Sequence, residues 1–345
     1  MKKIGVLGAG TWGMALARLL CNKGHQVRVW SALPAEIDEL QSTRRHKNLP
    51  DMIIPVALEF TKELEKAVTG MDMLLFAVPS PFVRSVAAQA APLVAEDQVI
   101  VDVAKGIEAD SFCTMSEVIE QELEKQNRGK VPVVALSGPT HAEEVSLDMP
   151  TTIVAACDDL KAAAWVQDVF MTDCFRVYTS TDKRGVELGG ALKNVIAFAV
   201  GISNGLGYGD NARAALITRG MSEITRLGLA MGCRAQTFAG LTGMGDLIVT
   251  ATSRHSRNNR AGYLVGTGCT AEQAVKQVGM VVEGLYALPA ARQLARKYGT
   301  QTPIMETVEA IVSGKMDASQ AASQLMNRER KLEQILSDDS CLLQR

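Results

Sequence analysis

The sequence predicts an α/β protein in which a doubly wound parallel sheet is followed by an all-helical C-terminal domain. Short apolar runs alternate with helix-like stretches over the first 180 residues, which is typical of strands joined by helical crossovers. From about residue 184 onward, long amphipathic stretches follow one another without strand-like runs. The length of 345 residues also exceeds that of most single domains. We therefore expect two domains, residues 1–185 and 186–337.

The strands of the first domain are predicted from apolar runs that each end near Gly, Pro, Ser or Lys. Short runs without polar alternation are typical of parallel strands buried on both faces. The stretches between them predict right-handed helical crossovers. The predicted strands are residues 4–7, 27–30, 73–78, 99–103, 131–136 and 152–156, with a last strand within 172–180, and the helices between them include 14–23, 82–91 and 113–126.

The second domain is predicted from amphipathic periodicity alone, and the residues that follow it, 338–345, are expected to fray. No Ser/Gly-rich linker separates the two halves, so we expect them to pack closely. The predicted helices are residues 186–203, 212–231, 271–277, 285–297, 303–312 and 318–336.

Composition argues against several classes of function. The 36 basic and 38 acidic residues give a net charge of -2, whereas nucleic-acid binders normally carry a basic excess. Seven cysteines without a CxxC pair, and four scattered histidines, predict neither a disulfide framework nor a metal site. The N-terminus lacks a signal-like segment, and no apolar stretch reaches the roughly 18 residues that span a membrane. We expect a cytoplasmic protein that binds no nucleic acid and inserts into no membrane.

Gly8, Gly10 and Gly13 form a G-x-G-x-x-G turn between the first predicted strand and a helix. In a Rossmann domain the first glycine allows the tight turn, the second lets a pyrophosphate approach the backbone, and the third packs helix against strand. The helix N-terminus then offers N–H groups to the phosphates. We therefore predict a dinucleotide site; the alternatives are a purely structural glycine turn and the nucleoside site of a methyltransferase.

The choice between NADH and NADPH is left open by residues 31–33. An acidic residue after the second strand would hold the ribose of NAD, and a nearby arginine would accommodate the 2′-phosphate of NADP, but the chain has Ser-Ala-Leu there. The basic run at 44–47 could reach a phosphate, although such runs are usually solvated. We expect both cofactors to be used, with a preference below ~100-fold, or about 2.7 kcal/mol.

Two lysines and one loop are candidates for chemistry. Lys105 and the segment 137–142 follow consecutive strands at the edge where open α/β sheets bind ligands. Lys193 lies in an otherwise apolar helix, where a charge is costly unless it has partners. Either lysine could instead lie at the surface. The loop at 240–260 combines glycines, hydroxyls, an amide and arginines, which are groups that bind a phosphate dianion.

Two other enzyme classes are disfavoured by the positions of their motifs. The G-x-S-x-G pattern at 201–205 ends a predicted helix, whereas a hydrolase nucleophile elbow must follow a strand. The G-x-x-x-x-G-K-[ST] loop of P-loop kinases and ATPases does not occur.

Together these segments resemble the bacterial NAD(P)-dependent sn-glycerol-3-phosphate dehydrogenases, from residue 3 to about 331. The resemblance implies reversible interconversion of glycerol 3-phosphate and dihydroxyacetone phosphate, which supplies the former for phospholipid synthesis. It further implies a Rossmann domain, a helical substrate domain and a homodimer. The motifs that carry it are GAGTWG at 8–13, AKGIE at 104–108, SGPTHAEEV at 137–145, GVELGGALKNVIA at 185–197, GDNARAALITRG at 209–220 and FAGLTGMGDLIVTATSRHSRNNRAG at 238–262.

The resemblance also implies roles for individual residues. Lys193 is implied to be the proton acceptor, with Lys105 and Asp246 as further catalytic residues, and no metal is implied. The implied contacts with a small phosphorylated substrate are Lys105, Gly138, Thr140, Lys193, Asp246, Ser256, Arg257 and Asn258. The implied contacts with NADPH or NADH are Gly8, Gly10, Thr11, Trp12, Gly13, Lys105, Ala142, Arg257, Val281 and Glu283.

The chemistry agrees with these residue types. A free lysine has a pKa of about 10.4, so a lysine that acts as a base near neutral pH needs a lowered pKa. Burial, Lys105 and Arg257 would lower the pKa of Lys193, and Asp246 would raise it. Two other functions stay open at this point. A dinucleotide sensor would not need both lysines, and a hydroxy-acid dehydrogenase would need a carboxylate site in place of the phosphate loop.

Overall fold

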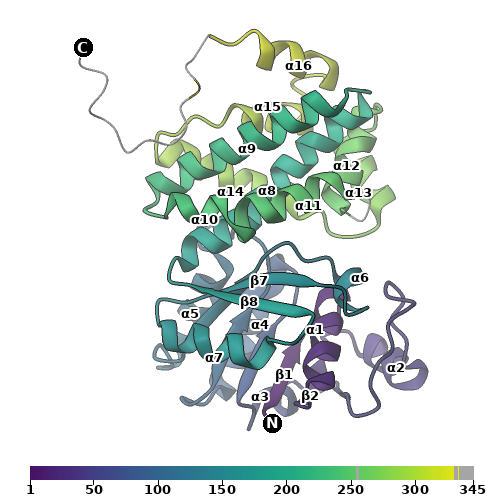
Figure 1. The fold of residues 1–345 in the computed structure, drawn as a ribbon, viewed down its shortest axis with the longest axis vertical. Helices are drawn as coiled ribbons and strands as arrows, with labels where there is room; N and C mark the ends of the chain where they lie inside the picture. The colour runs from purple at the N-terminus through teal and green to yellow at the C-terminus, as the bar shows by residue number, and fades with distance from the viewer. Residues whose placement is uncertain (254–255, 330–332, 334–345) are drawn as a thin grey trace.

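The computed structural model describes residues 1–253, 256–329 and 333, and places a sheet domain against a helical domain (Figure 1). The sheet has eight strands in the order β3-β2-β1-β4-β5-β6-β7-β8. The strands are β1 (Lys3–Leu7), β2 (Gln26–Trp30), β3 (Glu59–Thr61), β4 (Met73–Phe76), β5 (Val99–Asp102), β6 (Val133–Ser137), β7 (Thr151–Ala156) and β8 (Phe175–Ser180).

The sheet is mostly parallel, and its one antiparallel pair corrects the sequence prediction. The pairings from β3 through β6 are parallel, whereas β7 runs antiparallel to β6, and β8 is parallel to β7. The connection from β6 to β7 contains only the one-turn helix α6 (Ala142–Val145), which is too short to cover a sheet face in a parallel crossover. The edge strand β3 was not predicted because its Glu-Phe-Thr sequence contains no apolar run.

Helices cover both faces of the sheet, as a doubly wound fold requires. One hydrophobic core joins one sheet face to residues of α1, α2, α6 and α7, and another joins the opposite face to residues of α3, α4 and α5. These helices are α1 (Thr11–Asn22), α2 (Pro34–Thr43), α3 (Leu64–Val68), α4 (Val83–Ala90), α5 (Met115–Glu124) and α7 (Leu160–Phe170), with 3-10 turns at Ser80–Phe82 and Ala91–Leu93.

The second domain is helical throughout its described residues, as predicted, and begins with α8 (Lys183–Gly205) just after β8. The segment expected to be a phosphate loop is instead a π-helical turn followed by two short helices. The predicted helix at 318–336 ends at Met326; its residues 330–332 and 334–336, and the tail 338–345, lie outside the described part of the chain. The remaining elements are α9 (Asp210–Ala230), α10 (Ala235–Ala239), η3 (Leu241–Gly245), α11 (Asp246–Thr252), α12 (Arg257–Gly266), α13 (Ala271–Val278), α14 (Glu283–Lys297), α15 (Pro303–Val312) and α16 (Ala318–Met326).

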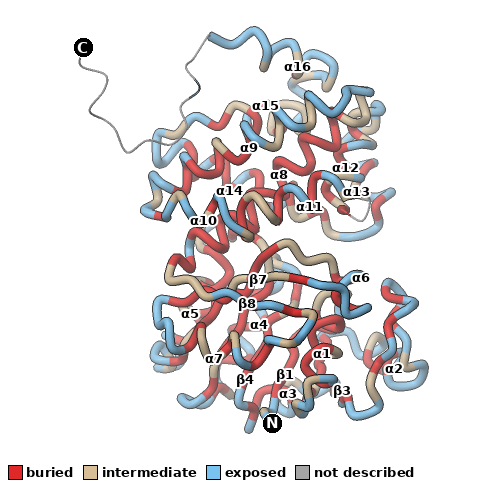
Figure 2. The backbone as a smooth tube through the Cα atoms, viewed as in Figure 1, coloured by how far each residue is buried: buried red, intermediate tan, exposed pale blue. Residues whose placement is uncertain are grey.

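Helix α8 forms the centre of the helical domain, with its backbone buried among the other helices (Figure 2). Its length and hydropathy would suit a membrane span, but the fold buries its apolar window completely, so these properties belong to a core helix. The glycine pattern at 201–205 lies inside this helix, which rules out a nucleophile elbow. Gly201 lies where α8 crosses α12, and no larger residue fits there, because a Cβ at Gly201 would lie 2.2 Å from the Asn259 carbonyl oxygen. This close crossing brings the start of α12 beside the middle of α8.

Candidate active site

The glycine turn after β1 has the shape that a dinucleotide site needs. Gly8 has a φ of +124°, and a Cβ on it would lie 2.7 Å from the Ala77 carbonyl group. A Cβ on Gly13 would lie 2.2 Å from the Gly8 oxygen. Gly10, at the N-terminus of α1, faces open space, since a Cβ there would meet nothing within 4 Å. The turn therefore leaves room for a pyrophosphate beside Gly10 and the N–H groups of Thr11 and its neighbours, which fits a nicotinamide dinucleotide.

Lys105, Lys193 and Asp246 meet at the junction of the two domains. Lys105 follows β5, Lys193 lies in the middle of α8, and Asp246 is the first residue of α11. Asp246 Oδ2 accepts a hydrogen bond from Lys105 Nζ at 2.6 Å, and Asp246 Oδ1 accepts one from Lys193 Nζ at 2.7 Å. Asp246 is 1% exposed. One buried carboxylate therefore orients two ammonium groups.

Three further groups complete this cluster. Lys105 Nζ donates to the Gly138 carbonyl oxygen at 3.1 Å, and Thr140 Oγ1 donates to the same oxygen at 3.2 Å. Lys193 Nζ also donates to Thr250 Oγ1. The sequence placed Thr250 in a phosphate loop; its spacing of four residues from Asp246 becomes informative only because the segment is helical.

The electrostatics of the cluster favour proton transfer by Lys193. Burial, together with the charges of Lys105 and Arg257, lowers the pKa of Lys193 to about 8 despite the raising effect of Asp246. Burial alone would raise the pKa of Asp246, but Lys105 and Lys193 hold it below its usual value. His141 is close enough to Lys193 to be affected by its charge. Burial and this charge lower the pKa of His141. Asp246 thus stays ionised while Lys193 titrates near physiological pH.

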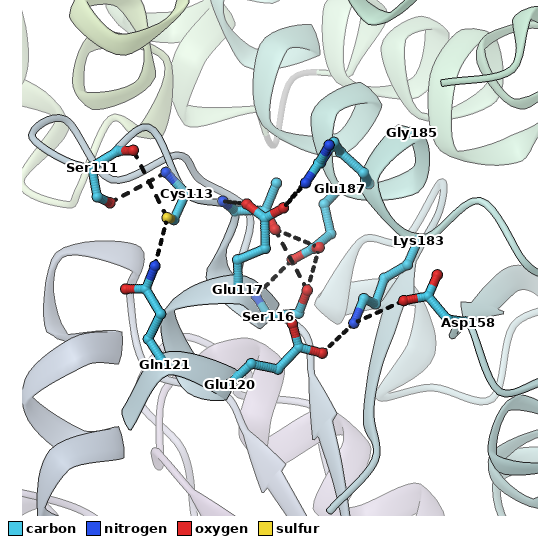
Figure 3. A network of polar contacts seen from close by, with 12 residues as sticks. Ser111, Cys113, Ser116, Glu117, Glu120, Gln121, Asp158, Lys183, Gly185 and Glu187 are labelled. Carbon is cyan, nitrogen blue, oxygen red and sulfur yellow. Dashed lines mark hydrogen bonds and ion pairs between the residues drawn. The ribbon is translucent and has the colours of Figure 1, made fainter. Parts of the chain in front are cut away.

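A polar network joins the first turns of α8 to the sheet domain (Figure 3). Glu187 on α8 accepts hydrogen bonds from Thr114 Oγ1 at 2.7 Å and from the Ser116 N–H at 2.8 Å. At the start of the same helix, Lys183 forms an ion pair with Glu120 on α5. Contacts at two successive turns of α8 therefore hold the start of this helix against α5 and the residue that precedes it.

A second cluster surrounds the start of α12. Asn258 Nδ2 donates to Asn194 Oδ1 at 3.0 Å, and Asn258 Oδ1 accepts from the Gly284 N–H at 2.8 Å. Glu283, the first residue of α14, accepts from Ser80 Oγ at 2.7 Å. Burial raises the pKa of Glu283, while Ser80 and the charge of Arg257 lower it. Neither Asn194 nor Ser80 was predicted, because only the fold brings them to this cluster.

The other predicted site residues have no direct contact with Lys193 or Asp246 among the hydrogen bonds described above. Ser256 caps α12 by accepting from the Asn259 N–H at 3.2 Å. Trp12 packs against the sheet core, and Ala142 begins α6. Val281 is half-buried just before α14. Among the described residues, no group of three or more His, Cys, Asp or Glu side chains could hold a metal ion.

Comparison with known proteins decides the family. Residues 3–163 match the model of the N-terminal domain of NAD-dependent glycerol-3-phosphate dehydrogenase, and residues 182–323 match that of its C-terminal domain. The chain belongs to the NAD-dependent glycerol-3-phosphate dehydrogenase family. The resemblance inferred from the sequence motifs is thereby confirmed.

Individual relatives cover nearly the whole chain. The chain is 62% identical over 334 residues to glycerol-3-phosphate dehydrogenase [NAD(P)+] 2 of Lactobacillus delbrueckii subsp. bulgaricus, an alignment that covers 96% of this chain and 99% of that protein. It is 49% identical to glycerol-3-phosphate dehydrogenase [NAD(P)+] of Fusobacterium nucleatum, with coverage of 96% and 99%. The crystal structure of glycerol-3-phosphate dehydrogenase from Coxiella burnetii matches with a TM-score of 0.90 at 36% identity, covering 95% of this chain and 99% of that one.

The predictions of fold class, enzyme class and cofactor type are confirmed by this membership. The chain is an oxidoreductase that uses NADH or NADPH and interconverts glycerol 3-phosphate and dihydroxyacetone phosphate. Its partner is therefore a small phosphorylated molecule. The sensor and hydroxy-acid alternatives are set aside.

Proposed function

We propose that Lys193 is the group that exchanges a proton with the C2 oxygen of the substrate, and that Asp246 and Lys105 position and tune it. The observation that carries this proposal is the buried pair of hydrogen bonds from both lysines to Asp246, at 2.6 and 2.7 Å. Burying an unpaired lysine would cost free energy of folding. A buried lysine that is paired with a carboxylate can keep a shifted pKa that suits proton transfer. Replacing Lys193 with methionine tests the role, because it removes the proton carrier and keeps an unbranched side chain.

The chemistry needs one proton and one hydride. When bound, the nicotinamide supplies the acceptor for the hydride in oxidation and its donor in reduction. In oxidation, neutral Lys193 accepts the hydroxyl proton of glycerol 3-phosphate as the C2 carbonyl forms. In reduction, protonated Lys193 gives that proton to the oxygen of dihydroxyacetone phosphate. Since the pKa of Lys193 is lowered to about 8, the lysine is mostly protonated at pH 7, which is the form that reduction requires. We propose that the enzyme supplies glycerol 3-phosphate for phospholipid synthesis.

The start of α12 is proposed to hold the substrate phosphate. Arg257 and Asn258 lie in the first turn of α12, where N–H groups and the helix dipole favour an anion. Arg257 lies near enough to the catalytic cluster for its charge to lower the pKa of Lys193. Ser256, Gly138 and Thr140 are proposed to line the same substrate site. Binding energy from the phosphate would then orient C2 toward Lys193.

Replacing Arg257 with alanine is expected to lower kcat/KM for dihydroxyacetone phosphate by roughly 10- to 150-fold. This range corresponds to losing a charge-assisted contact of about 1.5–3 kcal/mol. Steady-state absorbance at 340 nm measures it, with dihydroxyacetone, which has no phosphate, as the control substrate. A phosphate role predicts a much smaller loss on dihydroxyacetone. An equal loss on both substrates would assign Arg257 to the cofactor or to the fold.

The cofactor side of the site is proposed to include the glycine turn with Trp12, Lys105, Ala142, Arg257, Val281 and Glu283. The glycine turn lies beside Ala77, and the segment after Ala77 reaches Glu283 through Ser80. This path supports a cofactor that extends from the glycine turn toward the domain junction.

We further propose a domain division at residue 185, a homodimer and a cytoplasmic location. Sedimentation of the purified protein tests the dimer.

A further inference from the structure

Glu36 brings a carboxylate to the end of β2, where residues 31–33 contain none. The β2 strand ends at Trp30, whose carbonyl oxygen accepts a hydrogen bond from the Gly8 N–H at 2.8 Å. The end of β2 therefore adjoins the glycine turn. Ser31, which follows and is 6% exposed, donates its hydroxyl to Glu36 Oε2 at 2.6 Å.

The orientation of this carboxylate is fixed by the surrounding turn. The Leu33 N–H donates to Ser31 Oγ at 3.2 Å, which leaves the hydroxyl hydrogen directed at Glu36. The Glu36 N–H donates to the Leu33 carbonyl oxygen at 3.0 Å. Pro34, at the first position of α2, fixes one further backbone angle. Three hydrogen bonds and a proline thus hold the short segment from Ser31 to Glu36.

His46 lies near both Glu36 and the glycine turn. Burial lowers the pKa of His46, while the charge of Glu36 and a hydrogen bond to Ala9 raise it. Ala9 lies between the first two glycines of the turn. Glu36 and Ala9 are thus both close enough to His46 to raise its pKa, which agrees with the hydrogen bond that joins Gly8 to the end of β2.

We propose that Glu36 accepts hydrogen bonds from the adenosine ribose of the cofactor and makes this chain prefer NADH to NADPH. The proposal rests on cofactor binding at the glycine turn. A carboxylate has about four acceptor positions, so one bond from Ser31 leaves capacity for ribose hydroxyls. Rossmann dehydrogenases that use NAD place a carboxylate beside the ribose in this region of the fold. The 2′-phosphate of NADPH would instead bring a second negative charge against Glu36, which is unfavourable.

Two of the four basic residues at 44–47 are not free to bind a 2′-phosphate, because one has other contacts and one is buried. Arg44 Nη1 donates to the Leu58 carbonyl oxygen at 2.8 Å, and its guanidinium lies 5.2 Å from the ring centre of Phe60. His46 is 4% exposed. Arg45 and Lys47 are exposed on the same segment. The alternative of a phosphate site at 44–47 would thus depend on these two solvated side chains.

Calorimetric titration tests the proposal without relying on turnover. NADH and NADPH, and the fragments ADP-ribose and its 2′-phosphate, are titrated into the wild type, Glu36→Gln and the control Glu39→Gln, which removes the same charge from the same helix. We expect the wild type to bind NADH roughly 10-fold or more tightly than NADPH, from the worth of one charge-assisted hydrogen bond. Glu36→Gln should remove most of that ratio for the cofactors and for the fragments. Glu39→Gln should keep it within about twofold.

Tighter binding of NADPH than NADH by the wild type, or an unchanged ratio in Glu36→Gln, would overturn the proposal. Urea unfolding of each variant confirms that the compared proteins are equally folded. Failure of Lys193 as the proton carrier would leave these affinity ratios as they are, because the titration requires no proton transfer. The two proposals therefore fail separately.

Discussion

Replacing Lys193 with methionine is expected to slow dihydroxyacetone phosphate reduction by on the order of 10²–10⁴-fold, the usual worth of general acid–base catalysis. Methionine retains the unbranched, apolar part of the side chain, so α8 keeps its packing. Because Lys193 is proposed to contact substrate and not cofactor, the affinity for NADH should stay near that of the wild type. Single-turnover absorbance at 340 nm, together with a nucleotide titration, measures both quantities.

Lys183→Met is the matched control for this substitution. Lys183 is a buried lysine on the same helix, but its partner is Glu120 on α5 (Figure 3). Burial would lower the pKa of Lys183, yet Glu120 holds it above the usual value. Because the hydrogen bonds of Glu187 still hold α8 to the sheet domain, the control should lose stability and keep its rate. Near-normal turnover in Lys193→Met, or an equal rate loss in Lys183→Met, would mean that Lys193 is not the proton carrier.

Replacing Asp246 with asparagine is expected to damage both stability and rate. The isosteric change leaves two buried or half-buried ammonium groups without their shared carboxylate, and breaking such a pair costs about 3–5 kcal/mol of unfolding free energy. It also removes the group that raises the pKa of Lys193, so less of the lysine is protonated at pH 7. With the lysine misplaced as well, reduction should slow by roughly 10²-fold. Urea unfolding and the absorbance assay measure the two effects.

Asp182→Asn separates loss of catalysis from loss of structure. Asp182 caps α8 by accepting from the Gly185 N–H at 3.1 Å, and it also accepts from the Arg234 N–H at 2.9 Å. Removing its charge should lower stability while the folded enzyme turns over normally. If Asp246→Asn kept wild-type stability and turnover, the proposed role of the shared carboxylate would be wrong.

Much of the fold was predictable because local patterns determine it. The apolar runs of β1, β2, β4 and β5 and the periodicity of α15 depend on burial that the sequence itself encodes. The direction of β7 was not predictable from its own residues, since an apolar strand has the same composition in either orientation. The two helices that begin within 240–260 were missed because glycines and hydroxyls favour turns locally, and the packing of α11 and α12 on α8 overrides that preference.

The residue types that meet at the proposed site were predictable from the sequence, but their geometry was not. Lys193 stood out because a charge in an apolar helix needs a partner, and the motif resemblance named Asp246 as a neighbour. The contact of one carboxylate with both lysines could not be predicted, because α8 and α11 come together only in the tertiary structure. The roles of Ser80 and Asn194 have no local signal. The role proposed for Glu36 has no signal in residues 31–33 for a related reason: its carboxylate reaches the end of β2 from the next helix instead of from the strand itself.

The pH dependence of glycerol 3-phosphate oxidation tests the central claim most directly. Burial, Lys105 and Arg257 lower the pKa of Lys193 to about 8 despite Asp246, so the neutral, proton-accepting form should accumulate as the pH rises through that value. The account predicts that kcat/KM for oxidation rises with pH, has an apparent pKa near 8, and levels off above it, while kcat/KM for reduction falls over the same range. A profile without an inflection near 8, or one that still rises toward the ordinary lysine pKa of about 10.4, would contradict the assignment of Lys193 as the tuned acid and base.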